Sequence, residues 1–537
     1  MAVVSETHEV FNQAPPLAGY DVAADTALLA AVAREGAPWS VGDLHRLGKL
    51  TGSAEPQRWA DDANRFPPRL VTHDRFGHRV DEVEFHPSWH RLMEVAVAEG
   101  LAGTAWSTGH PGAHVARAAA LYVWSQVESG HTCPISMTYA VIPALRHAPD
   151  LAARYEPLLT ARAYDPGLRT PSAKAGLLAG MGMTEKQGGS DVRANTTTAT
   201  AAADGTWRLR GHKWFTSAPM CDLFLVLAQA PAGLSCFLVP RVLPDGTRNV
   251  FRIQRLKDKL GNRSNASSEP EFDDTTAWLV GGEGDGIRTI IEMVAMTRVD
   301  CVIGSAAGMR AALSQAIHHT RHRNAFGGPL AGKPAMRNVL ADMALESEAA
   351  TLLAVRLAGA VDRGEQGFKR LAVAVGKFWV CKRQPALVGE ALECLGGNGY
   401  VEESGMPRLY RDAPLNSIWE GSGNVQALDV LRTLRRDPSS LDVFLDEVAA
   451  AAGADRRLDD ALLGLKSELT DDPEGQARRV VERMALVLQA SLLVRHAPAD
   501  VADAFCASRL AGDWGHSFGT LPRGVDTAAL VDRAAPA

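Results

Sequence analysis

Residues 182–193 form a run of glycines and hydroxyl-bearing side chains, GMTEKQGGSDVR, that could bind a phosphate or the edge of a flat ring. Glycines let backbone N–H groups approach a ligand closely, and Ser and Thr hydroxyls add hydrogen bonds to it. A Gly-rich connector between two domains has the same composition. Both interpretations stay open on this run alone.

Glu420 lies in a second run, IWEGSGN at residues 418–424, just before a predicted helix. A carboxylate there could act as a general base, because apolar neighbours raise its pKa toward neutrality and a helix start offers N–H donors. The alternative is an ordinary exposed Glu in a Gly-rich helix cap. A third Gly-rich run, GGNGY at residues 396–400, follows an apolar segment.

The elements around these runs change in type along the chain. Apolar residues recur at three and four from about residue 25 to 180 and again from 286, which predicts helices. Between them, short runs rich in Thr, Val, Leu and Phe predict consecutive antiparallel strands at 196–201, 206–215, 223–229, 234–239 and 250–256. The later helices are predicted at 287–322, 334–363, 368–395 and 424–436.

This order of elements predicts a multi-domain α+β fold. An N-terminal α-helical domain is expected at 1–180, and the predicted strands place a β domain at 181–283. A helical bundle domain with Glu420 is expected at 284–437, followed by an extra C-terminal helical domain at 438–537.

Composition excludes several classes of protein. The 537 residues carry 56 Lys and Arg against 62 Asp and Glu, so the chain lacks the basic excess of a nonspecific nucleic-acid binder. Seven scattered cysteines without a C-x-x-C pair, no signal-like start and no apolar segment of membrane-spanning length indicate a protein of the reducing cytoplasm with no membrane partner. The histidines at 318, 319 and 322 lack an acidic partner at fitting spacing, so no metal site is predicted.

Two long segments carry a resemblance to a known family. Residues 182–194 and 393–412 resemble the two signatures of the acyl-CoA dehydrogenase family of flavoproteins, and the resemblance covers residues 60–436. The long tail, together with the runs at 262–267 and 416–424, is similar to the AidB-like subfamily of the alkylation response. The resemblance implies a barrel-like β domain between helical domains, with FAD at their junction and at a subunit interface of a homotetramer.

The resemblance also implies roles for individual residues. Glu420 matches the base, which removes a pro-R α-proton from an acyl thioester while hydride leaves the β-carbon for flavin N5. Thr184 and Ser190 match positions that contact substrate as well as cofactor. The cofactor-binding roles fall on Met181, Met183, Thr184, Gly189, Ser190, Phe215, Thr216, Ser217, Arg323, Phe326, Leu395, Gly396, Gly397, Gly399, Ile418, Trp419, Gly421, Ser422 and Asn424.

Four positions depart from the family pattern. Ser217 stands where Thr is common, and it keeps the hydroxyl. Phe215 stands where Trp is common, and it keeps the flat face but lacks the indole N–H. Trp419 stands where Tyr is common, and its larger ring is expected to narrow the pocket. Pro334 stands where an adenine-contacting Gln is common, and Pro offers neither a side-chain amide nor a backbone N–H.

We therefore expect an FAD-dependent, acyl-CoA dehydrogenase-like oxidoreductase that acts on a short or branched acyl thioester. The alternative implied by the resemblance is an AidB-like flavoprotein that binds and protects duplex DNA and has weak dehydrogenase activity. The candidate DNA contacts are Arg432, Arg435 and Arg436, but the tail from Pro438 onward is net acidic. Because phosphate binding needs clustered Lys and Arg, this charge favours the dehydrogenase.

Overall fold

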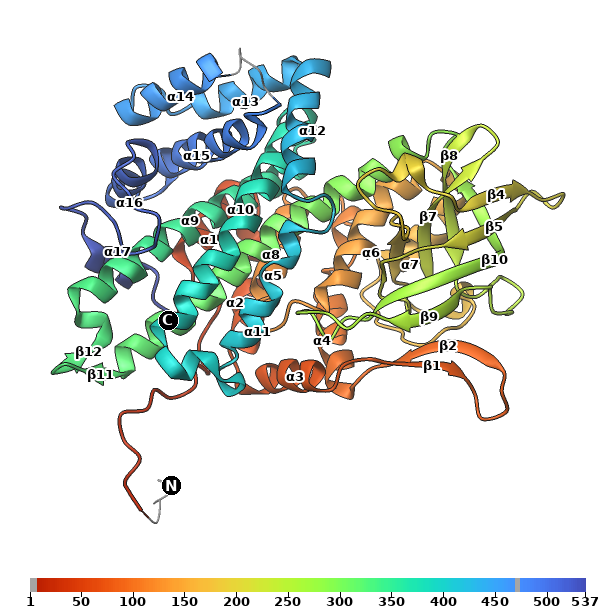
Figure 1. Ribbon diagram of the computed structural model, residues 1–537, viewed down its shortest axis with the longest axis horizontal. Helices are drawn as coiled ribbons and strands as arrows, with labels where there is room; N and C mark the ends of the chain where they lie inside the picture. The colour runs from red at the N-terminus through yellow and green to blue at the C-terminus, as the bar shows by residue number, and fades with distance from the viewer. Residues whose placement is uncertain (1–6, 469–473) are drawn as a thin grey trace. The chain divides into compact units, whose positions relative to one another are not determined.

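Figure 1 shows the computed structural model of the protein, which describes residues 7–468 and 474–537. The chain forms two compact units. One unit is Glu55–Asp300, and the other combines Met1–Ala54 with Cys301–Ala537. The order of helices, then strands, then helices confirms the predicted α+β class.

The unit Glu55–Asp300 begins with helices whose apolar faces are buried, as the repeat at three and four predicts. They are α3 (Ala54–Arg65), α4 (Pro87–Ala98), α5 (Ala113–Trp124), α6 (Thr132–Leu145) and α7 (Pro149–Leu159). A hairpin that the sequence did not predict, β1 (Arg69–His73) with β2 (Arg79–Glu84), interrupts them. Its strands are short and polar, and its turn is closed by the Asp74 carboxylate, which accepts from two backbone N–H groups.

The strands of this unit that follow the β1–β2 hairpin form one eight-stranded sheet that closes on itself. Pairing runs from β7 to β8, β10, β5, β4 and back to β7, and a ring of paired strands is a barrel. The strands are β3 (Ala179–Gly182), β4 (Thr198–Ala201), β5 (Trp207–His212), β6 (Thr216–Ser217), β7 (Leu223–Ala230), β8 (Gly233–Pro240), β9 (Arg252–Leu256) and β10 (Ser267–Val280). β3 and β4 pair with β7 in parallel, so the prediction of purely antiparallel pairing was wrong there.

The other unit is built on long helices. They are α1 (Thr26–Arg34), α2 (Val41–Thr51), α8 (Gly286–His322, which begins before the boundary), α9 (Pro334–Asp362), α10 (Gln366–Cys394), α11 (Met406–Asp412) and α12 (Gly423–Arg436). A two-residue hairpin, β11 (Asn324–Ala325) with β12 (Gly328–Pro329), separates α8 from α9. Pro334 is the first residue of α9, where a missing N–H costs nothing because that group has no helical partner.

The described part of the C-terminal tail adds five α-helices to the same unit. They are α13 (Ser439–Ala449), α14 (Arg456–Glu468), α15 (Ala477–His496), α16 (Ala499–Phe505) and α17 (Thr527–Arg533). Figure 1 shows α13 beside α12, and α14 packs on α15, which in turn packs on α9, α10 and α12. Among the described residues, no helix combines the length and the low charge that crossing a membrane would require.

Candidate active site

The predicted flavin loop leaves the barrel at the end of β3. Met181 is buried in that strand, whereas Gly189 and Ser190 are exposed at the tip of the loop. Two hydrogen bonds hold the backbone between them, because Asn195 Nδ2 donates to the Met183 carbonyl at 2.9 Å and the Trp214 N–H donates to the Thr184 carbonyl at 2.8 Å. A Cβ on Gly189 would lie 2.5 Å from Thr184 Oγ1, so only glycine lets the loop fold back on Thr184.

A buried ion pair anchors the same loop to the strand that precedes Phe215. Lys213 Nζ lies 2.7 Å from Glu185 Oε1, and neither side chain is exposed to solvent. Burial alone would raise the pKa of Glu185, but the Lys213 charge and hydrogen bonds from Thr196 and Thr197 hold it well below its usual range. Burial lowers the pKa of Lys213 to about 8 against the opposing effect of Glu185. The pair therefore remains charged at neutral pH and fixes the loop on the barrel.

Phe215, Thr216 and Ser217 lie together at β6, next to the loop. Phe215 is 50% exposed, which is unusual for a large apolar ring in a well-packed unit. Thr216 Oγ1 is buried without a hydrogen-bond partner among the described residues. Ser217 Oγ is 3.2 Å from Ser267 Oγ, across the pairing of β6 with β10. Lys257 Nζ lies 4.4 Å from the centroid of the Phe215 ring.

Glu420 lies in the other unit, on the loop that leads into α12. Its backbone is left-handed, with φ of 58°, and Gly421 follows with φ of 97°. This conformation costs a residue with a Cβ about 1 kcal/mol or more, and residues with such strain are common at functional sites. Gln426 Nε2 donates to the carbonyls of Glu420 and Gly421 at 2.9 and 3.0 Å, which compensates part of that cost.

The residues next to Glu420 in the sequence differ in their exposure to solvent. Ile418 is 62% exposed and Trp419 is partly buried. The indole N–H of Trp419 donates to Asn416 Oδ1 at 2.9 Å, so the orientation of this ring is fixed. Ser422 and Asn424 are exposed at the beginning of α12.

The residues expected to reach a neighbouring subunit lie only partly at the surface. Phe326 is 90% exposed at the tip of the β11–β12 hairpin and has a positive φ of 51°. Arg323 Nη1 donates to the Asn12 carbonyl at 2.5 Å, so part of its guanidinium is already engaged by the N-terminal segment. Gly396 and Gly397 are exposed, whereas Leu395 is buried. Gly399 is buried too, and a Cβ there would lie 2.1 Å from the Leu392 carbonyl oxygen.

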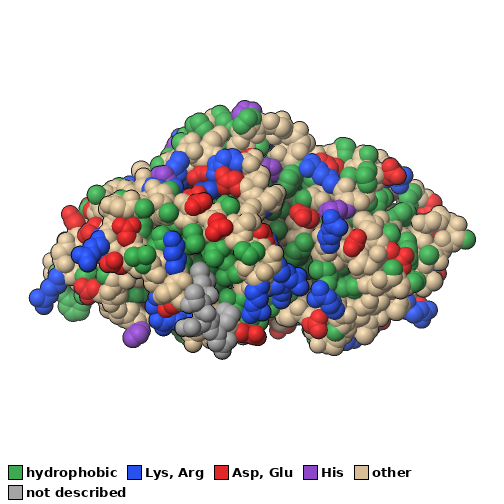
Figure 2. Space-filling model, turned by 90° about the horizontal axis from the view of Figure 1, so that it is seen from above, with side chains coloured by type: hydrophobic (Ala, Val, Ile, Leu, Met, Phe, Trp, Pro, Cys, Tyr) green, Lys and Arg blue, Asp and Glu red, His purple; other side chains and the backbone are tan. Residues whose placement is uncertain are grey.

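The candidate DNA contacts lie at the end of α12. Arg435 and Arg436 are exposed, and Arg432 is 3.4 Å from Asp429. The arginines of the tail are largely neutralised by carboxylates: Arg456 pairs with Asp460, Arg457 with Asp455 and Asp503, and Arg479 and Arg483 with Glu468. Figure 2 accordingly shows blue and red side chains interspersed on the face that it presents.

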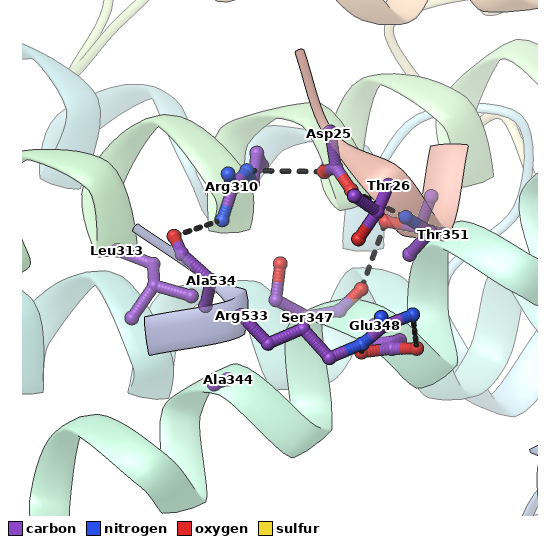
Figure 3. Close-up of a pocket in the computed structure, with 11 residues that line it drawn as sticks. Asp25, Thr26, Arg310, Leu313, Ala344, Ser347, Glu348, Thr351, Arg533 and Ala534 are labelled. Atoms are coloured by element: carbon purple, nitrogen blue, oxygen red, sulfur yellow. Dashed lines mark hydrogen bonds and ion pairs between the residues drawn. The ribbon is translucent and has the colours of Figure 1, made fainter. Parts of the chain in front are cut away.

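A cavity of about 20 Å³ in the second unit involves none of the predicted site residues (Figure 3). Arg310 bridges Asp25 at 3.1 Å and the Ala534 carbonyl at 2.7 Å. Arg533 pairs with Glu348 at 2.8 Å. The volume suits one water molecule. The ion pairs and the hydrogen bond around the cavity join α17 to α1, α8 and α9.

Sequence reasoning missed the residues that support the Glu420 loop. Lys377, Gln426 and Asn416 hydrogen-bond within or around this loop, and the first two are 1% exposed. A Lys or Gln in a helix ordinarily indicates the solvent face. The only available signal was Lys377 inside the apolar stretch of a predicted helix.

Three family models match successive parts of the chain. They are the adaptive response protein AidB N-terminal domain at residues 12–166, the acyl-CoA dehydrogenase middle domain at 180–275 and the acyl-CoA dehydrogenase C-terminal domain at 284–435. Their order matches the helical, barrel and bundle segments described above.

Individual relatives agree with these matches. The Escherichia coli protein AidB is 48% identical over 511 residues, covering 93% of this chain and 94% of its own. The structure of Caenorhabditis elegans ACDH-11 in complex with C11-CoA superposes with a TM-score of 0.86 at 26% identity, over 95% of this chain and 94% of that one. An acyl-CoA dehydrogenase from Bacillus anthracis complexed with FAD shares the fold, with a TM-score of 0.61 at 19% identity over 79% of this chain and 77% of that one. The chain thus belongs to the acyl-CoA dehydrogenase family of FAD-containing oxidoreductases, and within that family it is similar to AidB.

Proposed function

We propose that the protein oxidises a short or branched acyl-CoA thioester to the α,β-unsaturated acyl-CoA, with Glu420 as the base. The observation that carries this proposal is the left-handed backbone of Glu420 at the entry to α12, in a chain of this family. Hydrogen bonds to the carbonyls of the loop stabilise this strained backbone conformation. Strained residues that the surrounding structure stabilises in this way are concentrated at active sites.

The residues on the barrel fit FAD. The half-exposed ring of Phe215 offers a face for a flat ring, and the buried, unpartnered Thr216 Oγ1 offers a hydrogen bond. Among the residues that the structure describes, no atom lies within 4 Å of a Cβ built on Gly188, so the loop leaves room for the cofactor beside it. Met183, Thr184, Gly189 and Ser190 would hold the flavin and its pyrophosphate from this loop. When bound, FAD supplies the acceptor for the hydride that leaves the β-carbon.

Glu420 would take the α-proton. In the reaction the Cα–H bond breaks, the proton goes to a Glu420 carboxylate oxygen, and the electron pair forms the new Cα–Cβ double bond as hydride leaves Cβ. Thr184 and Ser190 would contact the thioester or the acyl chain. The indole of Trp419, held by Asn416, narrows the space beside the base, which favours short or branched chains over long ones.

An acyl-CoA panel tests this proposal. The purified protein, loaded with FAD under anaerobic conditions, is mixed with butyryl-, isovaleryl- and undecanoyl-CoA, and the loss of flavin absorbance is followed. We expect the fastest loss with one of the two smaller substrates. Undecanoyl-CoA is included because a relative was crystallised with C11-CoA. Fastest reduction by undecanoyl-CoA would refute the proposed preference for short or branched chains. No reduction by any of the three would refute the proposed dehydrogenase activity.

We further propose a homotetramer, in which the surface segments complete the FAD site of a neighbouring copy. Phe326 and Tyr400 support this, since their rings are 90% and 83% exposed and lie in the two segments that the family resemblance assigns to a neighbouring subunit's FAD. Tyr400 is close in sequence to Leu395, Gly396 and Gly397, and Phe326 is close to Arg323. The proposed homotetramer would therefore bring both groups of cofactor-binding candidates to a neighbouring FAD.

A further inference from the structure

We infer that Lys377 is the residue that positions the catalytic loop, and that its buried ammonium clamps both ends of the segment carrying Glu420. This inference rests on the proposed role of Glu420 as the base. It concerns a side chain of α10 that no comparison assigns to the reaction.

Lys377 contacts the loop at two carbonyls. Its Nζ donates to the Asn416 carbonyl at 3.1 Å and to the Gly421 carbonyl at 2.8 Å, and the residue is 1% exposed. Within the described part of the chain, no carboxylate lies at ion-pair distance from this ammonium. Burying a charge without a counterion is costly, so these two hydrogen bonds must hold the ammonium in place.

The two accepting carbonyls flank Glu420 in the chain. Asn416 begins the segment and Gly421 ends it, so one ammonium fixes the distance between the two ends. Fixing both ends of a six-residue loop leaves it few conformations. The left-handed backbone of Glu420 belongs to the conformation that remains.

Two further ties extend the clamp to the neighbouring helices. Asn416 Nδ2 donates to Ser305 Oγ on α8 at 3.2 Å, and Gln426 on α12 donates to the carbonyls of Glu420 and Gly421. Lys377 is the central member, because it is the one described side chain that bonds to the carbonyls at both ends of the segment. Without it, the loop can relax toward a negative φ at Glu420, which would turn the carboxylate away from the α-proton.

Lys377→Met tests the clamp because Met has nearly the same length but no N–H donor. We expect FAD content and the dissociation constant of a non-reducible acyl-CoA thioether to stay within threefold of wild type. The rate constant of flavin reduction at saturating acyl-CoA should fall ~100-fold, the size expected when a reacting group is misplaced by about 1 Å. Lys369→Met, on the same helix, is the matched control and should keep the wild-type rate.

Lys377→Gln retains N–H donors on a shorter, uncharged side chain, so its rate should lie between those of Lys377→Met and wild type. If Lys377→Met does not fold, Lys377→Gln alone decides, with an expected loss of at least ~10-fold in the rate constant at normal acyl-CoA affinity. Wild-type rates in whichever of these variants fold would overturn the inference. Equal losses of rate, ligand affinity and FAD content would also overturn it, because they would indicate a merely structural lysine.

Hydrogen–deuterium exchange separates this inference from the proposed function. In Lys377→Met the amides of residues 416–421 should exchange at least ~10-fold faster, while those of α9 stay unchanged. Faster exchange in a protein that no acyl-CoA reduces would support the clamp and refute the dehydrogenase. Unchanged exchange would refute the clamp whatever the activity.

Discussion

At the scale of single residues, Glu420 illustrates how a short run of sequence can indicate chemistry without indicating conformation. The run IWEGSGN predicts a carboxylate just before a helix, and α12 does begin at Gly423. The sequence gives no sign that Glu420, and not only the glycine after it, is left-handed. Gln426, six residues along the chain, and Lys377, which only the fold brings to the loop, donate hydrogen bonds to the loop carbonyls.

Replacing Glu420 by Gln should remove the base and keep the shape. Anaerobic flavin reduction by the best acyl-CoA should fall at least ~100-fold, the usual size of general-base loss, while FAD content is unchanged. Stopped-flow absorbance measures the rate, and Glu403→Gln, at an exposed position, is the control. Rapid bleaching in the Gln variant would show that another group takes the proton.

At the scale of elements, the four helices given bounds from the sequence, α8, α9, α10 and α12, were predicted to within a few residues, and the β domain was predicted in part. Long apolar repeats define α8, α9 and α10 because burial on one face dominates their sequence. β10, the longest strand at 14 residues, was not predicted, since Pro270 and the pair Asp273 and Asp274 interrupt the alternation. A bulge between Asp273 and Thr275 accommodates that interruption, and a bulge is specified by the partner strand rather than by local sequence.

The tail is attached to the bundle by charge as well as by apolar packing. Glu447 on α13 accepts from Arg356 on α9 at 2.7 Å and from Arg495 on α15 at 2.7 Å. Burial alone would raise the pKa of Glu447, but the hydrogen bonds and charges of the two arginines lower it from 4.5 to about 2. A carboxylate with a lowered pKa in the folded state stabilises the protein above pH 4.5 and loses that contribution as the pH falls toward 2.

Glu447→Gln should therefore be destabilising at neutral pH and nearly neutral in acid. The shift corresponds to at most ~3 kcal/mol of unfolding free energy, and partial exposure of the group reduces this figure. Urea unfolding at pH 7, 5, 4 and 3 measures the difference between wild type and variant, which should shrink below about pH 4.5. Asp460→Asn, in an exposed pair, should show little difference at any pH. A difference that persists undiminished at pH 3 would contradict this account.

At the scale of the whole molecule, the two classes of function expected from the sequence differ in what the surface must do. A dehydrogenase in the homotetramer that we propose uses surface segments to contact neighbouring copies, and a DNA-binding protein needs a basic face. The exposed rings of Phe326 and Tyr400 fit the proposed contact between copies. The ion pairs of the tail arginines weaken the case for the second, because paired guanidinium groups have less charge to offer to phosphates.

Light scattering on a size-exclusion column should give the mass of four chains for the FAD-loaded protein. Phe326→Asp combined with Tyr400→Asp should reduce that mass and weaken FAD retention, because charges would be buried at the contact. Phe76→Asp, at a ring that is 72% exposed on the β1–β2 hairpin, is the matched control and should leave both unchanged. A wild-type monomer that holds FAD tightly would refute the tetramer.

Duplex DNA separates the alternative from the dehydrogenase, and its test lies at the end of α12. We expect wild-type protein to shift duplex DNA only weakly at ~50 mM salt and hardly at all at ~200 mM, as nonspecific phosphate contacts do. Arg435→Glu with Arg436→Glu should abolish the remaining shift and leave flavin reduction by acyl-CoA unchanged, since both side chains are exposed and neither belongs to the loop of Glu420. Tight binding that persists at ~200 mM salt and is lost on this charge reversal, in a protein that acyl-CoA reduces only feebly, would instead establish the DNA-binding alternative.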